Sequence, residues 1–81
     1  MFINKASNGR NNICGLKISE IRKNLKISQR KLADLMQLSG IDMDKNAIQR
    51  IEAGKRFVTD IEIVAFSTVL KTNIEYLLIV N

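Results

Sequence analysis

The stretch from Ser28 to Gly54 constrains the fold more than any other part of the chain, because it contains two short helical patterns separated by a turn. Ser28 is a residue type that caps helix N-termini, and Ile27 and Leu32 stand at the two positions of a hydrophobic staple around it. Gly40 lies where the first pattern stops, and glycine adopts the left-handed conformation that ends many helices. The stretch therefore predicts two helices joined by a turn.

The start of the second helix depends on which of two aspartates, Asp42 or Asp44, is the N-cap. If Asp44 is the N-cap, Met43 and Ile48 stand at the staple positions. If Asp42 is the N-cap, a polar residue occupies one of those positions and cannot pack. We therefore expect a helix over residues 45–53, ended by the glycine that follows.

This second helix is expected to have one apolar and one polar face. At 100° per residue the apolar side chains turn inward, and they are Ala47, Ile48 and Ile51. The opposite side carries Asn46, Gln49, Arg50 and Ala53, and Lys45 stands at the leading end of the helix. Amide and guanidinium groups can pair with two atoms of adenine or guanine at once, so this face is suited to reading base edges in the major groove. An ordinary solvated helix face has the same composition, and that alternative stays open.

The N-terminal part of the chain predicts an arm followed by a helix. The helix is expected from about residue 13 to 25, with an apolar stripe formed by Cys14, Ile18, Ile21 and Leu25. On this stripe Cys14 is most simply a small buried residue. Residues 1–12 are polar and turn-rich, and we expect a flexible arm. The arm is either an ordinary frayed terminus or a basic extension in which Lys5 and Arg10 reach along a DNA backbone.

Two more helices are expected after the central pair. Thr59 and Glu62 have the spacing of a capping box, and the apolar stripe of that helix continues through Ile63, Phe66, Val69 and Leu70. Asn73 is the expected N-cap of a last helix, whose inward residues are Ile74, Leu77 and Leu78. The sequence thus predicts an all-α fold of five helices in one domain, residues 13–81.

The charge distribution favours an anionic partner. The formal net charge is +5 and the sequence pI is near 9.7. Residues 1–31 hold eight of the 13 Lys and Arg residues and a single acidic residue. Such an excess favours nucleic acid or an anionic membrane surface, although solubility alone would also account for it. A membrane surface is not the expected partner, because the chain lacks a continuous amphipathic basic helix. No secretory signal or apolar run of membrane-spanning length is visible, so we expect a cytoplasmic protein.

Catalytic and metal-binding chemistry find no support in the sequence. The chain has one cysteine and no histidine, which excludes an internal disulfide and a zinc site of the usual Cys and His kind. Asp42, Asp44 and Asn46 have the spacing that begins a calcium-binding EF-hand loop. Such a loop needs glycine at its sixth position and glutamate at its twelfth, which here are Ala47 and Ala53. No serine or cysteine has a histidine to activate it, so we expect neither an enzyme nor a cofactor.

Three groups of residues together resemble the Cro and phage-repressor type (Xre-like) helix-turn-helix family. They are Ser28-Gln29-x-x-Leu32-Ala33, then Ile48-x-x-Ile51-Glu52-x-Gly54-Lys55-Arg56, and the segment from Leu70 to Leu77. The resemblance covers roughly residues 13–78. It implies a compact lambda-repressor-like DNA-binding domain of five helices, with the helix-turn-helix at helices 2 and 3.

The resemblance also implies roles for individual side chains. Gln29 would hydrogen-bond a phosphate through its side chain or amide. On the recognition helix, four side chains would face bases or nearby phosphates, and they are Lys45, Asn46, Gln49 and Arg50. After this helix, Lys55 and Arg56 would contact the DNA backbone. Arg22 would form a structural ion pair with Glu52. The chain departs from the family at three places. The turn between helices 2 and 3 is about three residues longer, and Gln49 stands where many members have serine. Lys71 occupies a site often held by glycine, where we expect a strained corner.

These observations predict a sequence-specific transcriptional regulator, a repressor that occupies a double-stranded operator. A homodimer on a pseudo-palindrome, with half-sites about 34 Å apart, is the expected assembly. The last helix with residues 78–80 is either the dimer surface or the edge of the monomer core. The alternative function is a protein-interaction module, such as an antitoxin or adaptor, marked by a bulky apolar patch on the recognition helix or a missing basic flank. An antitoxin that binds its own operator would satisfy both.

Overall fold

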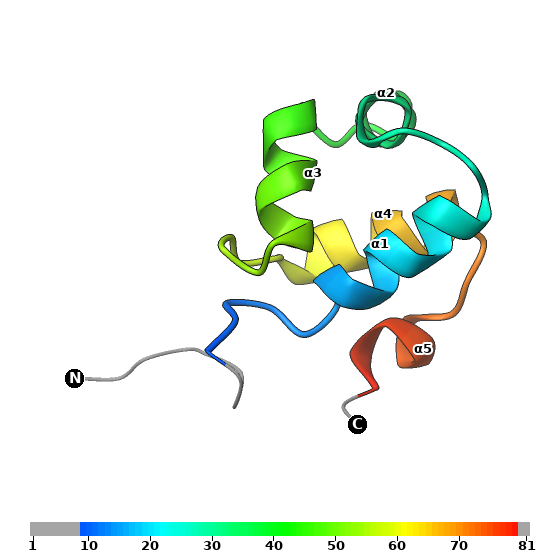
Figure 1. The fold of residues 1–81 in the computed structure, drawn as a ribbon. Helices are drawn as coiled ribbons and strands as arrows, with labels where there is room; N and C mark the ends of the chain where they lie inside the picture. The colour runs from blue at the N-terminus through cyan, green and yellow to red at the C-terminus, as the bar shows by residue number, and fades with distance from the viewer. Residues whose placement is uncertain (1–8, 80–81) are drawn as a thin grey trace.

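The structure is a computed structural model that describes residues 9–79, and these residues form five α-helices and no strand (Figure 1). The helices are α1 (Gly15–Asn24), α2 (Gln29–Leu38), α3 (Lys45–Glu52), α4 (Asp60–Val69) and α5 (Ile74–Leu78). In Figure 1, α2 and α3 lie above α1 and α4, and α5 lies below them. The predicted all-α class with five helices is confirmed. None of these helices has the length and apolar content needed to span a membrane.

Every helix, together with the turn before α3, contributes to one hydrophobic core. Its fully or nearly buried residues are Cys14, Ile18, Leu32, Ala33, Met36, Met43, Ala47, Ile48, Ile51, Ile63, Phe66, Leu70 and Leu77. Phe66 has the largest of these side chains and comes from α4. Burial raises the pKa of the Cys14 thiol to about 11, so the thiol remains protonated and serves as a small apolar group.

Four of the five helices begin at the N-caps that the sequence predicts. Ser28 accepts a hydrogen bond from the amide of Lys31 at 2.9 Å, and Asp44 accepts one from Ala47 at 2.8 Å. At α4 the predicted capping box between Thr59 and Glu62 is complete, and at α5 the amide of Tyr76 donates to Asn73. Because each cap satisfies an amide that has no carbonyl within the helix, these contacts fix the first turns locally.

The helices α1 to α4 all end in the same way. The residue after each C-cap has a positive φ, and these residues are Lys26 (60°), Gly40 (89°), Gly54 (77°) and Lys71 (56°). The next amide bonds back to a carbonyl five residues earlier, as in the 2.8 Å bond from Lys55 N to Arg50 O. This pattern is the Schellman motif, which satisfies the last carbonyls of a helix. The strained corner expected at Lys71 is present, and a second one that the sequence analysis did not anticipate lies at Lys26.

Two predicted helix faces are wrong in part. α1 begins two residues later than expected, and Leu25 is 48% exposed instead of lying on the buried stripe. Leu25 is the C-cap of α1, at the very end of the helix, and the chain turns away immediately after it at Lys26, which has a positive φ. In α5 only Leu77 is buried, and Ile74 and Leu78 are exposed. A helix of five residues is barely more than one turn, and only one of its sides can face the core.

Replacing Lys71 by glycine should stabilise the protein. A side chain at φ 56° crowds the backbone, and glycine removes that cost, so we expect the free energy of unfolding to rise by about 0.5–1 kcal/mol. Lys71→Ala is the matched control, because it removes the same charge and retains Cβ. Urea denaturation measures both variants. Equal stability of the glycine and alanine variants would contradict the expectation.

Candidate nucleic-acid interface

The polar face of α3 is exposed along its whole length. Its inner residues Ala47, Ile48 and Ile51 are buried against the core. The side chains on the other face have neither a hydrogen bond nor an ion pair with any residue in the range 9–79, and they are Lys45, Asn46, Gln49 and Arg50. Their donors and acceptors are therefore directed to solvent. Their contact with DNA stays a prediction.

The long turn before α3 is held in place and does not shift the start of the helix. Gln37 of α2 donates a hydrogen bond to the carbonyl of Met43 at 3.0 Å, and the side chain of Met43 is buried. A cleft of about 420 Å³ lies between α2 and the start of α3, lined by Arg30, Ala33, Asp34, Gln37, Asp44, Lys45 and Asn46. The cleft carries charges of both signs. Asp44, the N-cap of α3, is one of its acidic residues.

The N-terminus of α2 is the position that the family resemblance gives to a phosphate contact. The amides of Gln29 and Arg30 occupy the first two helical positions, where no carbonyl within the helix can accept them. Such amides can donate to a phosphate. The side chain of Gln29 already donates one hydrogen bond to Glu52 at 3.0 Å. Its backbone amide is therefore the group better placed for an anion.

Arg22 and Glu52 form an ion pair that connects α1 to α3. The Nε–Oε2 distance is 2.7 Å, and the side chains are only 11% and 8% exposed. The second oxygen of Glu52 accepts hydrogen bonds from Arg22 and Gln29. Arg22 also donates to the carbonyl of Ile27 between α1 and α2 at 2.9 Å. One carboxylate thus ties together the three helices that surround the candidate interface.

The two basic residues after α3 differ in their surroundings. The side chain of Lys55 is exposed and has no partner among the described residues. The guanidinium of Arg56 donates two hydrogen bonds to Glu62, each 3.0 Å long, and one to the carbonyl of Phe57. Arg56 therefore uses three of its five N–H donors within the protein and retains two.

The sequence profile of the helix-turn-helix family matches residues 18–77, which is most of the 81-residue chain. The chain belongs to the Cro/C1-type helix-turn-helix family. No curated protein and no solved structure matches it. The match runs from α1 through α5 and includes α2, α3 and the segment with Lys55 and Arg56. This helix-turn-helix protein is therefore a DNA-binding regulator in general terms.

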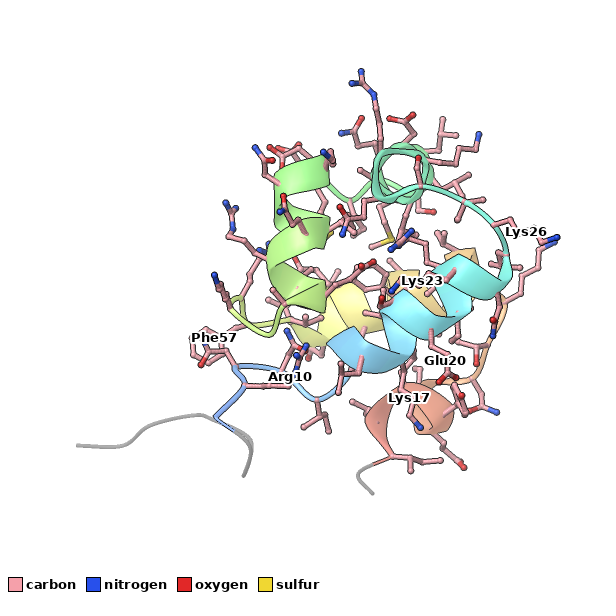
Figure 2. The ribbon with its side chains drawn as sticks, in the orientation of Figure 1. Arg10, Lys17, Glu20, Lys23, Lys26 and Phe57 are labelled. Carbon is pink, nitrogen blue, oxygen red and sulfur yellow. The ribbon has the colours of Figure 1, made fainter. Side chains whose placement is uncertain are left out.

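The residues that sequence analysis missed lie just before the family match. Residues 10–12 were expected to belong to a flexible arm, and the structure corrects this boundary. Arg10 and Asn12 donate hydrogen bonds to backbone carbonyls at the end of α3 and in the loop after it, and Asn12 is only 9% exposed. Figure 2 places Arg10 beneath the C-terminal end of α3. Lys5, the other basic residue of the expected arm, lies outside the described residues.

Removing Arg22 should destabilise the fold strongly. Arg22→Met leaves the carboxylate of Glu52 almost buried without its cation, which should lower the free energy of unfolding by about 3 kcal/mol. Lys23→Met is the control, since Lys23 is exposed and a change there should stay within about 0.5 kcal/mol. Urea denaturation at neutral pH measures both. Equal losses in the two variants would mean that the ion pair has no special role.

Glu62 should make the protein more stable at neutral pH than in acid. Hydrogen bonds from Arg56 hold the pKa of the Glu62 carboxyl below its usual value. A lowered folded-state pKa contributes stability above the unfolded pKa of about 4.3, and this stability is lost as the pH falls through the folded pKa. The stability difference between the native protein and Glu62→Gln should therefore shrink between pH 7 and pH 3. Denaturation at a series of pH values measures it, and a difference independent of pH would contradict the assignment.

Proposed function

We propose that this helix-turn-helix protein is a sequence-specific transcriptional regulator, a repressor that acts by occupying a site in double-stranded DNA. The observation that supports this function best is the exposed polar face of α3, whose opposite face is buried in the core. A helix with this arrangement can enter the major groove without unfolding any part of the protein. Its amide and guanidinium groups are the types that recognise base edges.

Within the proposed complex, the side chains of α3 divide between bases and phosphates. Asn46, Gln49 and Arg50 face the bases, and Lys45 at the leading end of the helix lies near the backbone. Three further groups hold phosphates, namely the amide or side chain of Gln29, the ammonium of Lys55 and the two remaining N–H groups of Arg56. Phosphate contacts fix the register on the duplex and base contacts give the specificity.

The proposed active form is a homodimer in the cytoplasm, bound to a pseudo-palindromic operator. A domain of this size presents one recognition helix, and two copies would read half-sites about 34 Å apart. Leu78 and Ile79 are exposed at the end of α5, which supports this region as the dimer surface. Val80, the last residue of the expected surface, lies outside the described residues.

A protein-interaction module, such as an antitoxin or adaptor, is the other function that this fold could serve. Its expected signs are a bulky apolar patch on the outer face of α3 or the absence of a basic flank. Over residues 9–79 the outer face of α3 has no large apolar side chain, and Lys55 and Arg56 supply the flank. These features favour DNA as the partner.

Selection of binding sites from random duplex DNA tests the proposed function. We expect an enriched motif whose affinity falls steeply with salt, because phosphate contacts release counterions. Arg50→Ala should lose about 1–3 kcal/mol of discrimination at particular base pairs. Lys55→Ala should weaken binding to all sequences alike and reduce the slope of log affinity against log salt by about one. Fluorescence anisotropy on the winning and scrambled duplexes measures all three quantities.

The two alanine variants serve as controls for each other, because each removes one positive charge. The side chains of both residues are exposed and have no hydrogen bond or ion pair with any described residue, so neither change should alter stability by more than about 0.5 kcal/mol. If no motif is enriched, and if neither variant binds DNA differently from the native protein, DNA is not the partner. A protein partner would then become the first candidate.

A further inference from the structure

Residues 10–12 form a strap across the end of the recognition helix and the loop that follows it. We call Arg10, Asn11 and Asn12 the N-terminal strap. The amide of Asn11 donates to the carbonyl of Gly54 at 2.8 Å, and its side chain donates to the carbonyl of Lys55 at 3.1 Å. The side chain of Asn12 donates to the carbonyl of Arg56 at 2.8 Å. Three consecutive carbonyls after α3 are therefore held by the strap.

Asn12 also joins the strap to the helices on both sides. Its Nδ2 donates a second hydrogen bond, 3.0 Å long, to the carbonyl of Ile51 in α3. Its Oδ1 accepts the amide of Gly15 at 2.8 Å, which starts α1. Gly15 lies so near that a Cβ added there would be 2.2 Å from the oxygen of Ile51. The start of α1 and the end of α3 are thus in direct backbone contact, with Asn12 bonded to both.

Arg10 places a positive charge at the C-terminus of α3. Its guanidinium donates to the carbonyls of Ile51 and Glu52 at 3.3 and 2.8 Å. The last carbonyls of a helix carry partial negative charge, so a cation here is stabilised. The guanidinium also lies against Gly54, where an added Cβ would be 2.6 Å from the Arg10 Cζ atom. Arg10 therefore covers the helix end and faces the protein instead of extending away from it.

We infer that the N-terminal strap is a positioning element for DNA binding, which fixes the end of α3 and the backbone under Lys55 and Arg56 without touching DNA itself. This inference rests on the proposed function. The side chain of Lys55 has no partner within the described chain, so its direction depends on the backbone that carries it. That backbone is held at residues 54, 55 and 56 by Asn11 and Asn12. Loss of the strap should therefore leave Lys55 with a less defined position.

The strap should matter more for binding than for folding. The core and the ion pair between Arg22 and Glu52 already hold α3, and the Schellman motif at Gly54 already ends it. The contacts of Asn11 add hydrogen bonds at the surface and contribute no apolar side chain to the core. A purely structural strap would lower stability and binding together. A positioning strap lowers affinity in protein that remains folded.

The experiment compares strap variants with a charge-matched control on the duplex selected by the native protein. Asn11→Ala removes the side-chain bond to Lys55 and retains the backbone bond to Gly54. Asn12→Asp retains the acceptor for Gly15 and replaces both donated hydrogen bonds with a carboxylate that faces carbonyl oxygens. Arg10→Ala removes the charge, and its control is Lys17→Ala, because Lys17 lies beside α5 and over the ring of Tyr76 (Figure 2).

We expect all folded strap variants to bind about 3- to 30-fold more weakly, and Lys17→Ala to bind nearly as well as the native protein. In a Lys55→Ala background most of the loss caused by Asn11→Ala should disappear, because both changes remove the same phosphate contact. Arg10→Ala, which acts through the same loop, should likewise lose less affinity in that background.

Backbone order parameters should fall at residues 55 and 56 in Asn11→Ala, from about 0.85 towards 0.6. If Asn12→Asp does not fold, Asn11→Ala still tests the positioning role of the strap. This variant should fold, because the side-chain hydrogen bond that it removes lies at the surface.

The possible failures are distinguishable. If the native protein enriches no motif, the proposed function fails, whatever the order parameters show. If a motif is enriched and the folded strap variants bind it normally, the positioning inference is overturned and the proposed function stands. If Arg10→Ala loses the same affinity in the native and Lys55→Ala backgrounds and also lowers the salt slope by about one, Arg10 touches DNA directly, which overturns the inference as well.

Discussion

The carboxylate of Glu52 is the group on which the arrangement of the first three helices depends. It is the last residue of α3, where the partial negative charge of the helix end disfavours an acid. The position is tolerable because Arg22 and Gln29 together donate three hydrogen bonds to its two oxygens. Arg10 covers the carbonyl of the same residue. The nearly buried carboxylate of Glu52 thus has hydrogen-bond donors from α1 and α2, and its backbone carbonyl has one from the strap, so this one residue constrains where each of them can lie.

As a consequence, α3 contacts the rest of the described chain only through its inner face and its two ends. A helix of eight residues is too short to persist alone in water, so its form depends on those attachments. Asp44 caps its start, Ile48 and Ile51 bury its inner edge, and Glu52 anchors its end. None of these contacts uses the outer face. The side chains there are exposed and take no part in holding the fold together, and this is why the proposed function assigns them to DNA.

Sequence reasoning succeeded where a contact joins residues three or four apart. The staple partners predict Asp44 and not Asp42 as the N-cap of α3, and the capping box of α4 follows from its spacing alone. It failed where a helix stops earlier than its apolar pattern, as at Leu25, because periodicity does not show where the chain turns back. It also failed for Asn12, whose hydrogen-bond acceptors are 39 and 44 residues away. An asparagine that donates to distant backbone has no periodic pattern, and in the sequence it resembles a turn residue.

Arg56 shows how the fold and the proposed interface can share one side chain. The family resemblance implies a contact between Arg56 and the DNA backbone, and the structure pairs Arg56 with Glu62 of the α4 capping box. The two roles are compatible because a guanidinium has five donors and three are occupied within the protein. A side chain already fixed by Glu62 would lose little conformational entropy on meeting a phosphate, whereas Lys55 would lose more. In the proposed complex Arg56 therefore offers a phosphate donors in a fixed position, and Lys55 offers a positive charge on a flexible side chain. The direction of the Lys55 side chain depends on its backbone alone, and this is why the proposed strap matters for Lys55.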